Sequence, residues 1–430
     1  MQLVAVGIGG AGGRVAAALQ RDSAERRTSY VTGACVLDTD TAAIEQLETI
    51  PEENRHPFGL EETAGAGTEG NRTAGVAAAD ANRLAVRRAI DSLTTSAVDA
   101  ILLVAGVAGG TGSGATPPIA QALGEVYDRP IYTVGVLPAE ATPAAASNTL
   151  RALRALDSVV DGQLLFDTNE WQTTGTPLDS QRDRLNTELA TRIGELCAAG
   201  ETVATQPVGQ TVVDASDIIA TLSGSEAGCI TLGYASRAPS PSESESQPSL
   251  TDRIRNFVRG SQADDIDALT AIHTIETTVR EATRGRLTID CERNAASRGL
   301  VVFAGPSGWL HKEAIDAQRA WLQDELACRE LRSGDAPCRG LSARPHFTVG
   351  CRPPAGRAGP VHKSSRRLHR LRDLVSTHHI RRHRVRVRSS ALAPSRRVNS
   401  TPRESSACRR QPHRNGDLLQ YTHNRRIGVE

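Results

Sequence analysis

The feature that most constrains this 430-residue chain is a glycine-rich turn, Gly109-Gly-Thr-Gly-Ser-Gly114, set between a buried strand and a helix. The strand is predicted over Ala100–Ala105 and the helix around Ile119–Leu123, and a flexible linker fits poorly between two such elements. Only small residues occur inside the turn, so it offers a ligand backbone N–H groups and hydroxyls. Because the turn also lies at a helix N-terminus, it predicts a phosphate-binding site. A Walker-type P-loop is excluded, since neither lysine of the chain, Lys312 or Lys363, lies near it.

A second glycine-rich turn covers residues 7–14, between a predicted strand at Leu3–Val6 and a predicted helix at Arg14–Arg21. Taken alone, it fits the GxGxxG pattern of a dinucleotide-binding Rossmann unit, with Asp38 or Asp40 following the second strand. A tight structural turn without a ligand would look similar. A Rossmann dehydrogenase has no use for a second glycine-rich turn of this kind, whereas a triphosphate held from two sides does. The two turns together therefore favour a nucleoside triphosphate over NAD.

The first 140 residues show strands alternating with helices. Further buried strands are predicted at Ala34–Leu37 and Ile131–Leu137, and a helix at Ala77–Leu93. This alternation predicts a parallel, doubly wound α/β sheet. Such sheets bind their ligands at the carboxyl ends of the strands.

A long helix with one apolar stripe, Leu178–Ala199, connects this region to a second α/β region. There, helices are predicted at Ala268–Arg284 and Lys312–Leu326, and a strand at Leu300–Ala304. We therefore expect four parts in chain order: a nucleotide-binding domain over residues 1–177, a connecting helix over 178–200, a smaller α/β domain over 207–337 and a basic tail over 338–430.

The basic tail differs sharply in composition from the rest of the chain. Residues 1–333 hold 28 Lys and Arg against 44 Asp and Glu, whereas residues 334–430 hold 22 against 5. No apolar period remains after Pro337, so we expect a disordered tail whose removal leaves thermal stability almost unchanged. The change in composition is typical of an out-of-frame reading of a GC-rich gene. The alternative is a genuine nucleic-acid-binding arm, in which Phe347 and Tyr421 would be the only aromatic residues for stacking on bases.

Composition disfavours several other classes of protein. No run approaches the roughly 20 apolar residues of a transmembrane helix, and the first residues lack the basic and apolar regions of a cleaved signal. The eight Cys include no CxxC pair, and five of them, an odd number, fall in residues 1–333. A disulfide framework and a zinc knuckle are therefore both disfavoured, no metal-binding cluster is expected, and a cytoplasmic location is predicted.

At its two glycine-rich turns the chain resembles the tubulin/FtsZ superfamily of GTPases, whose signature loop is the GGTGSG at 109–114. The resemblance extends from residue 1 to about residue 337 and is strongest to the archaeal CetZ group. Further matching stretches follow in order: Phe166-Asp-Thr-Asn-Glu-Trp171, Val213-Asp-Ala-Ser-Asp-Ile-Ile219, Leu232-Gly-Tyr-Ala-Ser236, Val302-Phe-Ala-Gly-Pro306 and Glu330-Leu-Arg-Ser-Gly-Asp335. The resemblance implies a GTPase domain, a connecting helix and a C-terminal activation domain, the last one truncated if the reading frame shifts.

The resemblance also implies which residues bind GTP or GDP. They are Gly10, Ala11, Gly12, Gly13 and Arg14 for the α- and β-phosphates, Gly110, Thr111 and Gly112 for the β- and γ-phosphates, Glu140 for the ribose, and Asn169 and Asn186 for guanine. An amide can accept from guanine N1 and N2 and donate to O6, which adenine cannot satisfy. Residues 65–71 match, less strictly, the loop that senses the γ-phosphate. Mg²⁺ is implied by the triphosphate rather than by a ligand cluster.

The residues implied for hydrolysis are Asp214 and Asp217, which match the acidic pair of a loop that family members insert into the neighbouring subunit's pocket. Their spacing lets both carboxylates face one way at a helix start, where they can position water in line with the γ-phosphate. Asp214 or Ser216 would also suit the N-cap of that helix, and both roles are compatible. Asn186 lies near the start of the connecting helix, and Asp214 follows its far end. One chain therefore cannot easily place both in the same pocket.

The combined expectation is a GTP-hydrolysing cytoskeletal protein that polymerises head to tail with copies of itself and completes its active site between adjacent subunits. The resemblance suggests archaeal cell-shape control, leaves room for peripheral association with the cell envelope and gives no reason to expect nucleic-acid binding by residues 1–337. One alternative is a non-polymerising regulatory GTP-binding protein. It is favoured by Val212, where relatives usually have Asn, and by Arg182, where they often have an aromatic residue that stacks on the base. An NAD-dependent oxidoreductase is a distant alternative.

Overall fold

The computed structural model describes residues 1–26, 29–199, 211–223, 228–237, 268–292, 294, 296–337, 346–352 and 365–375. The strands are β1 (Leu3–Ile8), β2 (Val31–Asp38), β3 (Arg55–Pro57), β4 (Ala100–Gly106), β5 (Ile131–Leu137), β6 (Gly162–Asp167), β7 (Gly228–Ser236), β8 (Arg298–Gly305), β9 (Glu330–Pro337) and β10 (His346–Arg352). The α-helices are α1 (Gly9–Glu25), α2 (Thr41–Glu45), α3 (Leu60–Thr63), α4 (Arg72–Ala81), α5 (Arg83–Asp91), α6 (Gly110–Gly124), α7 (Pro143–Leu156), α8 (Thr168–Trp171), α9 (Leu178–Ala198), α10 (Ala215–Leu222), α12 (Ala268–Arg284) and α13 (Lys312–Leu326). Two short 3-10 helices are η1 (Glu52–Asn54) and η3 (Ser307–Trp309). A further helical segment covers residues 366–375.

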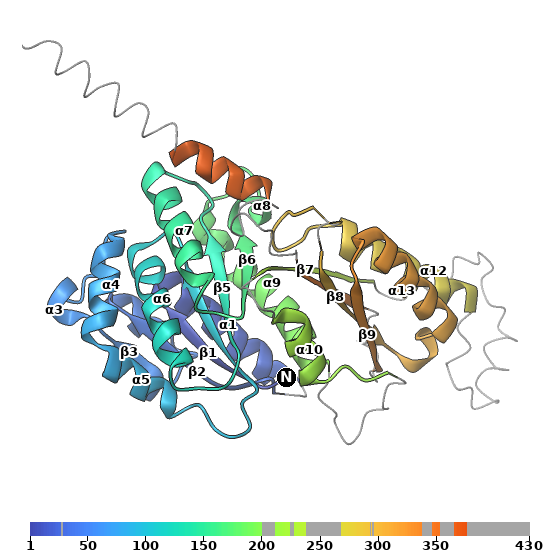
Figure 1. Ribbon diagram of the computed structural model, residues 1–430, viewed down its shortest axis with the longest axis horizontal. Coiled ribbons are helices and arrows are strands. Elements are labelled where there is room, and N and C mark those ends of the chain that lie inside the picture. The colour runs from blue at the N-terminus through green and yellow to red at the C-terminus, as the bar shows by residue number, and fades with distance from the viewer. Residues whose placement is uncertain are drawn as a thin grey trace, which may run out of the picture. The chain divides into compact units, whose positions relative to one another are not determined.

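The described strands form one continuous sheet in the order β3-β2-β1-β4-β5-β6-β7-β10-β8-β9 (Figure 1). Strands β1 to β7 pair in parallel, and so do β8 and β9. Only β10 runs antiparallel to both of its neighbours. The direction of the strand order changes at β1, which lies between β2 and β4, and sheets of this kind bind ligands at such a point. The predicted parallel, doubly wound α/β sheet is thus confirmed.

Both faces of the parallel sheet are buried under helices. Leu3 of β1 lies in one core with Leu19 of α1 and Leu189 of α9. Its neighbour Val4 lies in a second core with Leu123 of α6. All four leucines and Val4 are at most 1 % exposed. Each such side chain stabilises the fold by about 1.5–3 kcal/mol. Because the strand faces are covered, a ligand can reach this sheet only at the strand ends.

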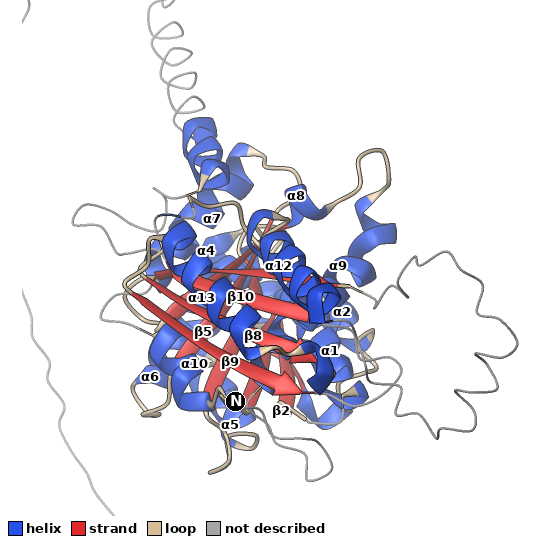
Figure 2. Ribbon diagram, turned by 90° about the vertical axis from the view of Figure 1, so that its right-hand side faces the viewer, coloured by secondary structure: helices blue, strands red, loops and turns tan. Residues whose placement is uncertain are grey.

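The second α/β region has a core of its own. Figure 2 shows α12 and α13 lying across strands of this region, and the core joins Ile275 and Val279 of α12 to Phe303 of β8 and Leu322 of α13. Strand β7 links the two regions, because it pairs with β6 on one side and with β10 on the other. The predicted helices Ala268–Arg284 and Lys312–Leu326 are confirmed at both ends.

Several helices differ from the sequence-based expectation. Helix α1 begins at Gly9, inside the first glycine-rich turn, instead of at Arg14. The single helix expected over Ala77–Leu93 is two helices, α4 and α5, which meet at Asn82. Helix α7 was not predicted at all. Glycine is a poor helix former, so the start of α1 carries no helical pattern, and only packing reveals it.

Two segments of the tail expected over residues 338–430 form regular secondary structure, strand β10 and the helical segment 366–375. Strand β10 pairs with both β7 and β8, and the helical segment 366–375 buries Leu368 and Leu371 against a core that includes Leu150 of α7. Backbone pairing needs no alternating apolar side chains, and two leucines three positions apart suffice to attach a helix. The composition argument therefore missed both segments. The other residues of the expected tail lie outside the described residues.

Ending the chain after Pro337 is now expected to destabilise it, because β7 and β8 would each lose their shared partner β10. We expect the melting temperature to fall by at least about 10 °C relative to the full chain. Ending the chain after Arg381, where the first compact unit ends, is the matched control and should change it little. Equal melting temperatures for both truncated chains would show that β10 contributes no stability.

Candidate functional site

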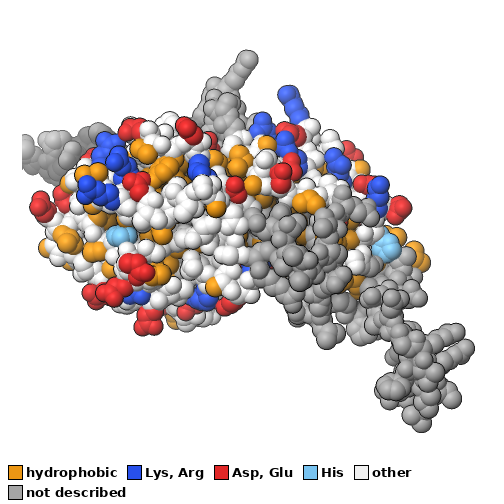
Figure 3. All heavy atoms as spheres, turned by 90° about the horizontal axis from the view of Figure 1, so that it is seen from below, with side chains coloured by type: hydrophobic (Ala, Val, Ile, Leu, Met, Phe, Trp, Pro, Cys, Tyr) orange, Lys and Arg blue, Asp and Glu red, His pale blue; other side chains and the backbone are white. Residues whose placement is uncertain are grey.

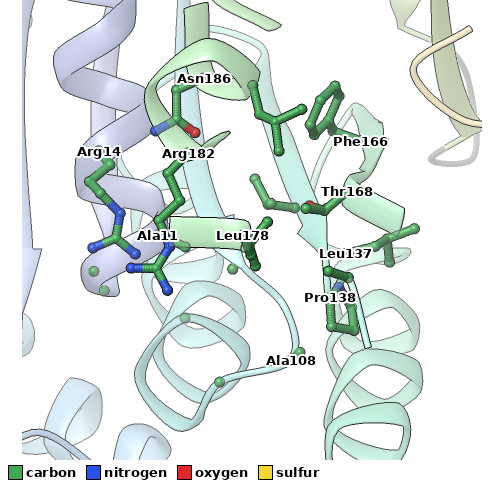
Figure 4. Close-up of a pocket in the computed structure, with 18 of the residues that line it drawn as sticks. Ala11, Arg14, Ala108, Leu137, Pro138, Phe166, Thr168, Leu178, Arg182 and Asn186 are labelled. Carbon is green, nitrogen blue, oxygen red and sulfur yellow. The ribbon is translucent and has the colours of Figure 1, made fainter. Parts of the chain in front are cut away.

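A cavity of about 290 Å³ lies at the carboxyl ends of β1, β4, β5 and β6 (Figure 4). Its walls come from the start of α1, the turn from β4 into α6, the segments after β5 and β6, and the first turns of α9. The lining residues are Ile8, Gly9, Gly10, Ala11, Arg14, Gly106, Ala108, Gly109, Gly110, Thr111, Gly112, Val136, Leu137, Pro138, Ala139, Phe166, Thr168, Leu178, Arg182, Leu185 and Asn186. Both glycine-rich turns identified in the sequence therefore face one space.

The starts of α1 and α6 both face this cavity without a side-chain cap. Ile8 precedes α1 and Gly109 precedes α6, and neither provides a capping hydrogen bond; neither helix has an acidic residue in its first turn. By contrast, the Thr142 hydroxyl accepts from the backbone N–H of Ala145 at the start of α7. The first N–H groups of a helix have no partner within the helix and carry partial positive charge. The cavity therefore has two clusters of anion-binding N–H groups, which suits a chain of phosphates.

The glycines of these turns are required by close packing. A Cβ at Gly110 would lie 2.2 Å from Thr68 Oγ1 and 2.7 Å from the backbone nitrogen and oxygen of Asn71. A Cβ at Gly12 would lie 2.1 Å from the carbonyl oxygen of Val104 in β4. Gly12 thus allows α1 to pack closely on the sheet, and Gly110 allows α6 to pack closely against residues 68–71.

Three polar side chains line one wall of the cavity: Arg14 from α1, and Arg182 and Asn186 from α9 (Figure 4). The side-chain amide of Asn186 makes no hydrogen bond with any described residue, so it is free to contact a ligand. Arg182 pairs with the exposed Asp179 at 2.6 Å, whereas Arg14 makes no ion pair among the described residues. Burial, and then the positive charge of Arg182, lower the pKa of Arg14. An anion bound beside Arg14 would relieve this repulsion.

One buried carboxylate lies beside the first glycine-rich turn. Asp38 ends β2 and is 2 % exposed. Its Oδ1 accepts hydrogen bonds from the backbone N–H groups of Thr39 (2.7 Å) and Asp40 (3.2 Å). Its Oδ2 is 3.7 Å from the position that a Cβ would take at Gly10. Burial raises the pKa of Asp38 from 3.8 to about 6.

Replacing Asp38 with Asn is expected to stabilise the apo protein above pH 6. The folded state of the parent binds its proton more tightly than the unfolded state does, so Asp38 lowers the free energy of unfolding as the pH rises from about 4 to 6. Asn keeps the acceptor oxygen but does not ionise. We expect the two proteins to be equally stable at pH 4 and Asp38→Asn to be more stable at pH 7.5 by about 2–3 kcal/mol. Urea unfolding at both pH values measures this, and a constant difference between the proteins would contradict it.

Comparison with known proteins identifies the family. Residues 2–175 match the model of the tubulin/FtsZ family GTPase domain, and residues 175–343 match that of the tubulin-like CetZ C-terminal domain. The chain is 37 % identical to tubulin-like protein CetZ5 of Haloferax volcanii over 350 residues, which cover 81 % of this chain and 86 % of that protein. The chain belongs to the CetZ group of the tubulin/FtsZ family. Tubulin-like protein CetZ1 of the same organism is 35 % identical over 344 residues, 79 % of this chain and 85 % of that one.

Two solved CetZ structures share the fold. The GDP-bound monomer of CetZ1 from Haloferax volcanii is 29 % identical, with a TM-score of 0.72 over 88 % of this chain and 100 % of that chain. The GTPγS-bound protofilament of CetZ2 from Haloferax volcanii is 28 % identical, with a TM-score of 0.73 over the same shares. The family resemblance noted in the sequence is thereby confirmed, and the chain falls in a family of GTPases with guanine-nucleotide-bound and filament-forming members.

Most of the residues expected at the nucleotide line the cavity. They are Gly10, Ala11, Arg14, Gly110, Thr111, Gly112 and Asn186. Gly12 and Gly13 are buried in packing contacts behind it. Glu140 is exposed and directly follows the lining residue Ala139, and Asn169 directly follows Thr168. The Thr111 hydroxyl is hydrogen-bonded to the hydroxyls of Thr39 and Thr68. Thr111 would therefore contact phosphate through its backbone.

The expected catalytic pair lies elsewhere and caps a helix. Asp214 Oδ1 accepts from the backbone N–H of Asp217 at 2.9 Å, and Asp217 Oδ2 accepts from that of Asp214 at 3.4 Å. Of the two residues predicted as possible N-caps, Asp214 and Ser216, it is Asp214 that caps the helix. Arg332 Nε lies 3.4 Å from Asp217 Oδ1. Each carboxylate still has accessible surface, since Asp214 is exposed and Asp217 is half-buried.

Helix α10 lies at the end of the sheet opposite to the cavity (Figure 1). Ser223, just after α10, contacts Tyr132 at the start of β5, with 2.6 Å between their hydroxyl oxygens. The ammonium group of Met1, before β1, donates to the carbonyl of Cys197 at the end of α9. Helix α9 therefore runs from the cavity to the amino ends of the strands, about 30 Å at 1.5 Å per residue. The two aspartates are not brought to the cavity of their own chain.

Two common functional features are absent from the described residues. No group of three or more His, Cys, Asp or Glu side chains there is arranged to hold a metal ion. No described helix combines the length and apolar character that crossing a bilayer requires.

The sequence analysis missed one residue beside the site, Asn148 of α7. Its side-chain Nδ2 donates to the carbonyls of Gly70 and Ala108, at 2.9 and 3.1 Å. The signal that could have revealed α7 is the pair Thr142 and Pro143, because a capping hydroxyl followed by proline at the first helical position marks a helix start. The many alanines that follow Pro143 form no clear apolar stripe, so the helix was not predicted.

Proposed function

We propose that this chain binds GTP in the cavity between α1, α6 and α9, polymerises head to tail and hydrolyses GTP at the contact between subunits. The observation that carries this proposal is the meeting of two uncapped helix starts with the free amide of Asn186 in one cavity. The helix starts suit the phosphates, and the amide suits the base edge of guanine. GDP and GTPγS occur in the two similar CetZ structures, which supports the choice of guanine nucleotides.

The hydrolytic step is assigned to Asp214 and Asp217 of the next subunit along the filament. Both lie at the opposite end of the sheet from the cavity, so a head-to-tail contact would carry them to a neighbour's phosphates. Such a heterologous contact repeats without closing and builds a filament. The CetZ2 protofilament supports self-assembly of this chain. The carboxylates would orient the attacking water in line with the γ-phosphate.

Mg²⁺ fits this site as a companion of the triphosphate. The described residues offer no cluster of three carboxylate, His or Cys ligands, so the ion would take most of its ligands from phosphate oxygens and water. When bound, it supplies charge neutralisation between the β- and γ-phosphates. The protein supplies the backbone N–H groups and Arg14.

The cellular role we propose is shape control from the cytoplasm of an archaeal cell, with peripheral attachment to the envelope through filaments. The CetZ relatives from Haloferax volcanii support the archaeal context. On the face seen in Figure 3, the described Lys and Arg side chains are interspersed with Asp and Glu, which suits self-assembly better than binding to nucleic acid.

A second candidate is a regulatory GTP-binding protein that does not polymerise. Val212, two residues before Asp214, is 41 % exposed and places an apolar group where the catalytic loop would need to hold water. Arg182 replaces the aromatic residue that would stack on the base. Pelleting with GTP separates the two candidates, because only the first one predicts that the protein sediments.

Replacing Asn186 with Ala is expected to remove most of the preference for GTP. We expect the parent to bind GTP at least about 100-fold more tightly than ATP, since a site built to hydrogen-bond one base leaves polar groups unpaired with the other. In Asn186→Ala, GTP affinity should fall about tenfold or more while ATP affinity stays within about threefold. Fluorescence titration with both nucleotides measures this. Equal affinity of the parent for GTP and ATP would refute the role of Asn186.

A further inference from the structure

Residues 65–71 are tied to the start of α6 by three hydroxyl groups. The Thr111 hydroxyl oxygen is 2.7 Å from that of Thr39 and 3.2 Å from that of Thr68. The backbone N–H of Gly67 donates to the carbonyl of Thr39 at 3.0 Å. We call residues 65–71 the loop over α6, because they lie directly against Gly110, the first residue of that helix.

Asn148 holds the same loop from the other side. Its one amide nitrogen donates to the carbonyl of Gly70 in the loop and to that of Ala108 in the turn before α6. Both hydrogens of the amide are therefore used to join two backbone segments that flank Gly110. Gly70 and Glu69 both have positive φ values, +80° and +49°. For Glu69 this is a strained conformation, which persists only where surrounding contacts enforce it.

We propose that Asn148 is a positioning residue that holds the loop over α6 against Gly110, fixes the start of α6 at the cavity in this way, and so sets the preference for a triphosphate over a diphosphate. The proposal rests on the proposed function, because it takes the cavity as a guanine-nucleotide site. Of the two helix starts in the cavity, only that of α6 is packed against this loop. The loop packs against Gly110, which lines the cavity, so the hydrogen bonds of Asn148 fix the start of α6 before the nucleotide binds.

The physical basis is preorganisation. Without the two hydrogen bonds, the loop and the start of α6 packed against it gain conformational freedom in the apo protein, and a ligand that needs the ordered helix start must supply the ordering free energy itself. A triphosphate would lose affinity for this reason. A diphosphate, which has no terminal phosphate to place at the start of α6, would lose little. The effect of Asn148 therefore appears in the ratio of the two affinities rather than in either one alone.

The test compares Asn148→Ala, Asn148→Asp and the parent in titrations with GTPγS and with GDP. We expect both variants to bind GTPγS about tenfold more weakly, a factor that corresponds to 1.4 kcal/mol, and GDP within about twofold of the parent. Asn148→Asp keeps the shape of the side chain but cannot donate, and its carboxylate would face two carbonyls. It should therefore behave like Asn148→Ala.

Thr142→Ala is the matched control, because it weakens the start of α7 without touching the bridge from Asn148. Its ratio of GTPγS to GDP affinity should equal that of the parent. Hydrogen exchange of the apo proteins gives a second readout: the amides of residues 65–71 should exchange faster in Asn148→Ala than in the parent or in Thr142→Ala.

Several results would overturn the proposal. Equal losses of GTPγS and GDP affinity, or the same change of ratio in Thr142→Ala, would leave Asn148 with a general structural role. Unchanged exchange of residues 65–71 would show that the bridge does not order the loop. The binding of the parent distinguishes failure of the proposed function from failure of this proposal. If the parent binds no guanine nucleotide, the proposed function is refuted. If the parent and Asn148→Ala bind GTPγS equally well, only the role of Asn148 is refuted.

Discussion

Replacing Asp214 with Asn is expected to lower the GTPase rate per subunit at least about 100-fold while leaving GTP binding within about twofold of the parent. A positioned carboxylate that activates water contributes about 10²–10⁴ to a rate, and the cavity that binds the nucleotide does not contain Asp214. Polymers of the variant should also last longer, since they would keep GTP. Phosphate release, nucleotide titration and pelleting measure the three quantities.

Asn is the informative substitution because Asp214 also caps α10. Asn caps a helix about as well as Asp, whereas Ala would cost about 1 kcal/mol in addition to any loss of chemistry. If Asp214→Asn keeps the melting temperature of the parent but loses hydrolysis, catalysis is separated from capping. If Asp214→Asn hydrolyses GTP like the parent while Asp214→Ala is slow, the residue acts only through the fold.

The position of α10 gives the same experiment a second control. We expect the parent's rate per subunit to rise with protein concentration, because each site is completed by a neighbour. Mixing Asp214→Asn with a binding-deficient variant should restore some activity, since one variant supplies the nucleotide and the other the carboxylate. A dilute, strictly monomeric parent that hydrolyses GTP at the full rate would refute the shared site.

Replacing Gly110 with Ala is expected to abolish nucleotide binding, with an affinity loss of at least about 100-fold. The added Cβ would lie 2.2 Å from Thr68 Oγ1 and 2.7 Å from backbone atoms of Asn71, so α6 or the loop over it must move. Either movement displaces N–H groups from the cavity, and a misplacement of about 1 Å can cost about 100-fold where groups must be held in a fixed geometry. Titration with GTPγS checks this.

Gly124→Ala is the control for Gly110→Ala, because it lies in the same helix and its added Cβ meets only Ile131 Cδ1 at 3.8 Å. Alanine is also the better helix former. We expect this variant to bind GTPγS like the parent and to be at least as stable. Parent-like binding by Gly110→Ala would show that the loop yields to the Cβ and that the tight packing of α6 is dispensable.

The sequence predicted the parallel sheet well because its strands are buried on both faces. Strand β5 (Ile131–Leu137) and helices α12 and α13 have the predicted bounds, since apolar patterning and flanking turns mark them. It could not predict where α1 begins, because Gly9 to Gly13 have low helix propensity and only close packing on β4 and β2 makes them helical. It likewise could not predict β10, whose place between β7 and β8 is a long-range pairing.

Those parts of the cavity that sequence motifs mark could be predicted. Both glycine-rich turns were identified from small residues between a strand and a helix, and Asn186 from family resemblance. The hydrogen bonds that Thr111 makes with Thr39 and Thr68 join residues tens of positions apart, and no local pattern reports them. Asn148 was missed for the same reason: it contacts Gly70 and Ala108, which are 78 and 40 positions away.

Apart from Arg14, the proposed phosphate-facing part of the cavity is made of main chain, and this determines how such a site can change in evolution or in engineering. No substitution deletes a backbone N–H except one to proline, so the main-chain part of the anion site cannot be weakened gradually by trimming side chains. It can only be blocked by added atoms, as at Gly110, or lost altogether. Amides also do not titrate. Adaptation to a different nucleobase or salt level therefore has to proceed through side chains, Arg182 and Asn186 of α9 among them, while the main-chain phosphate contacts stay the same.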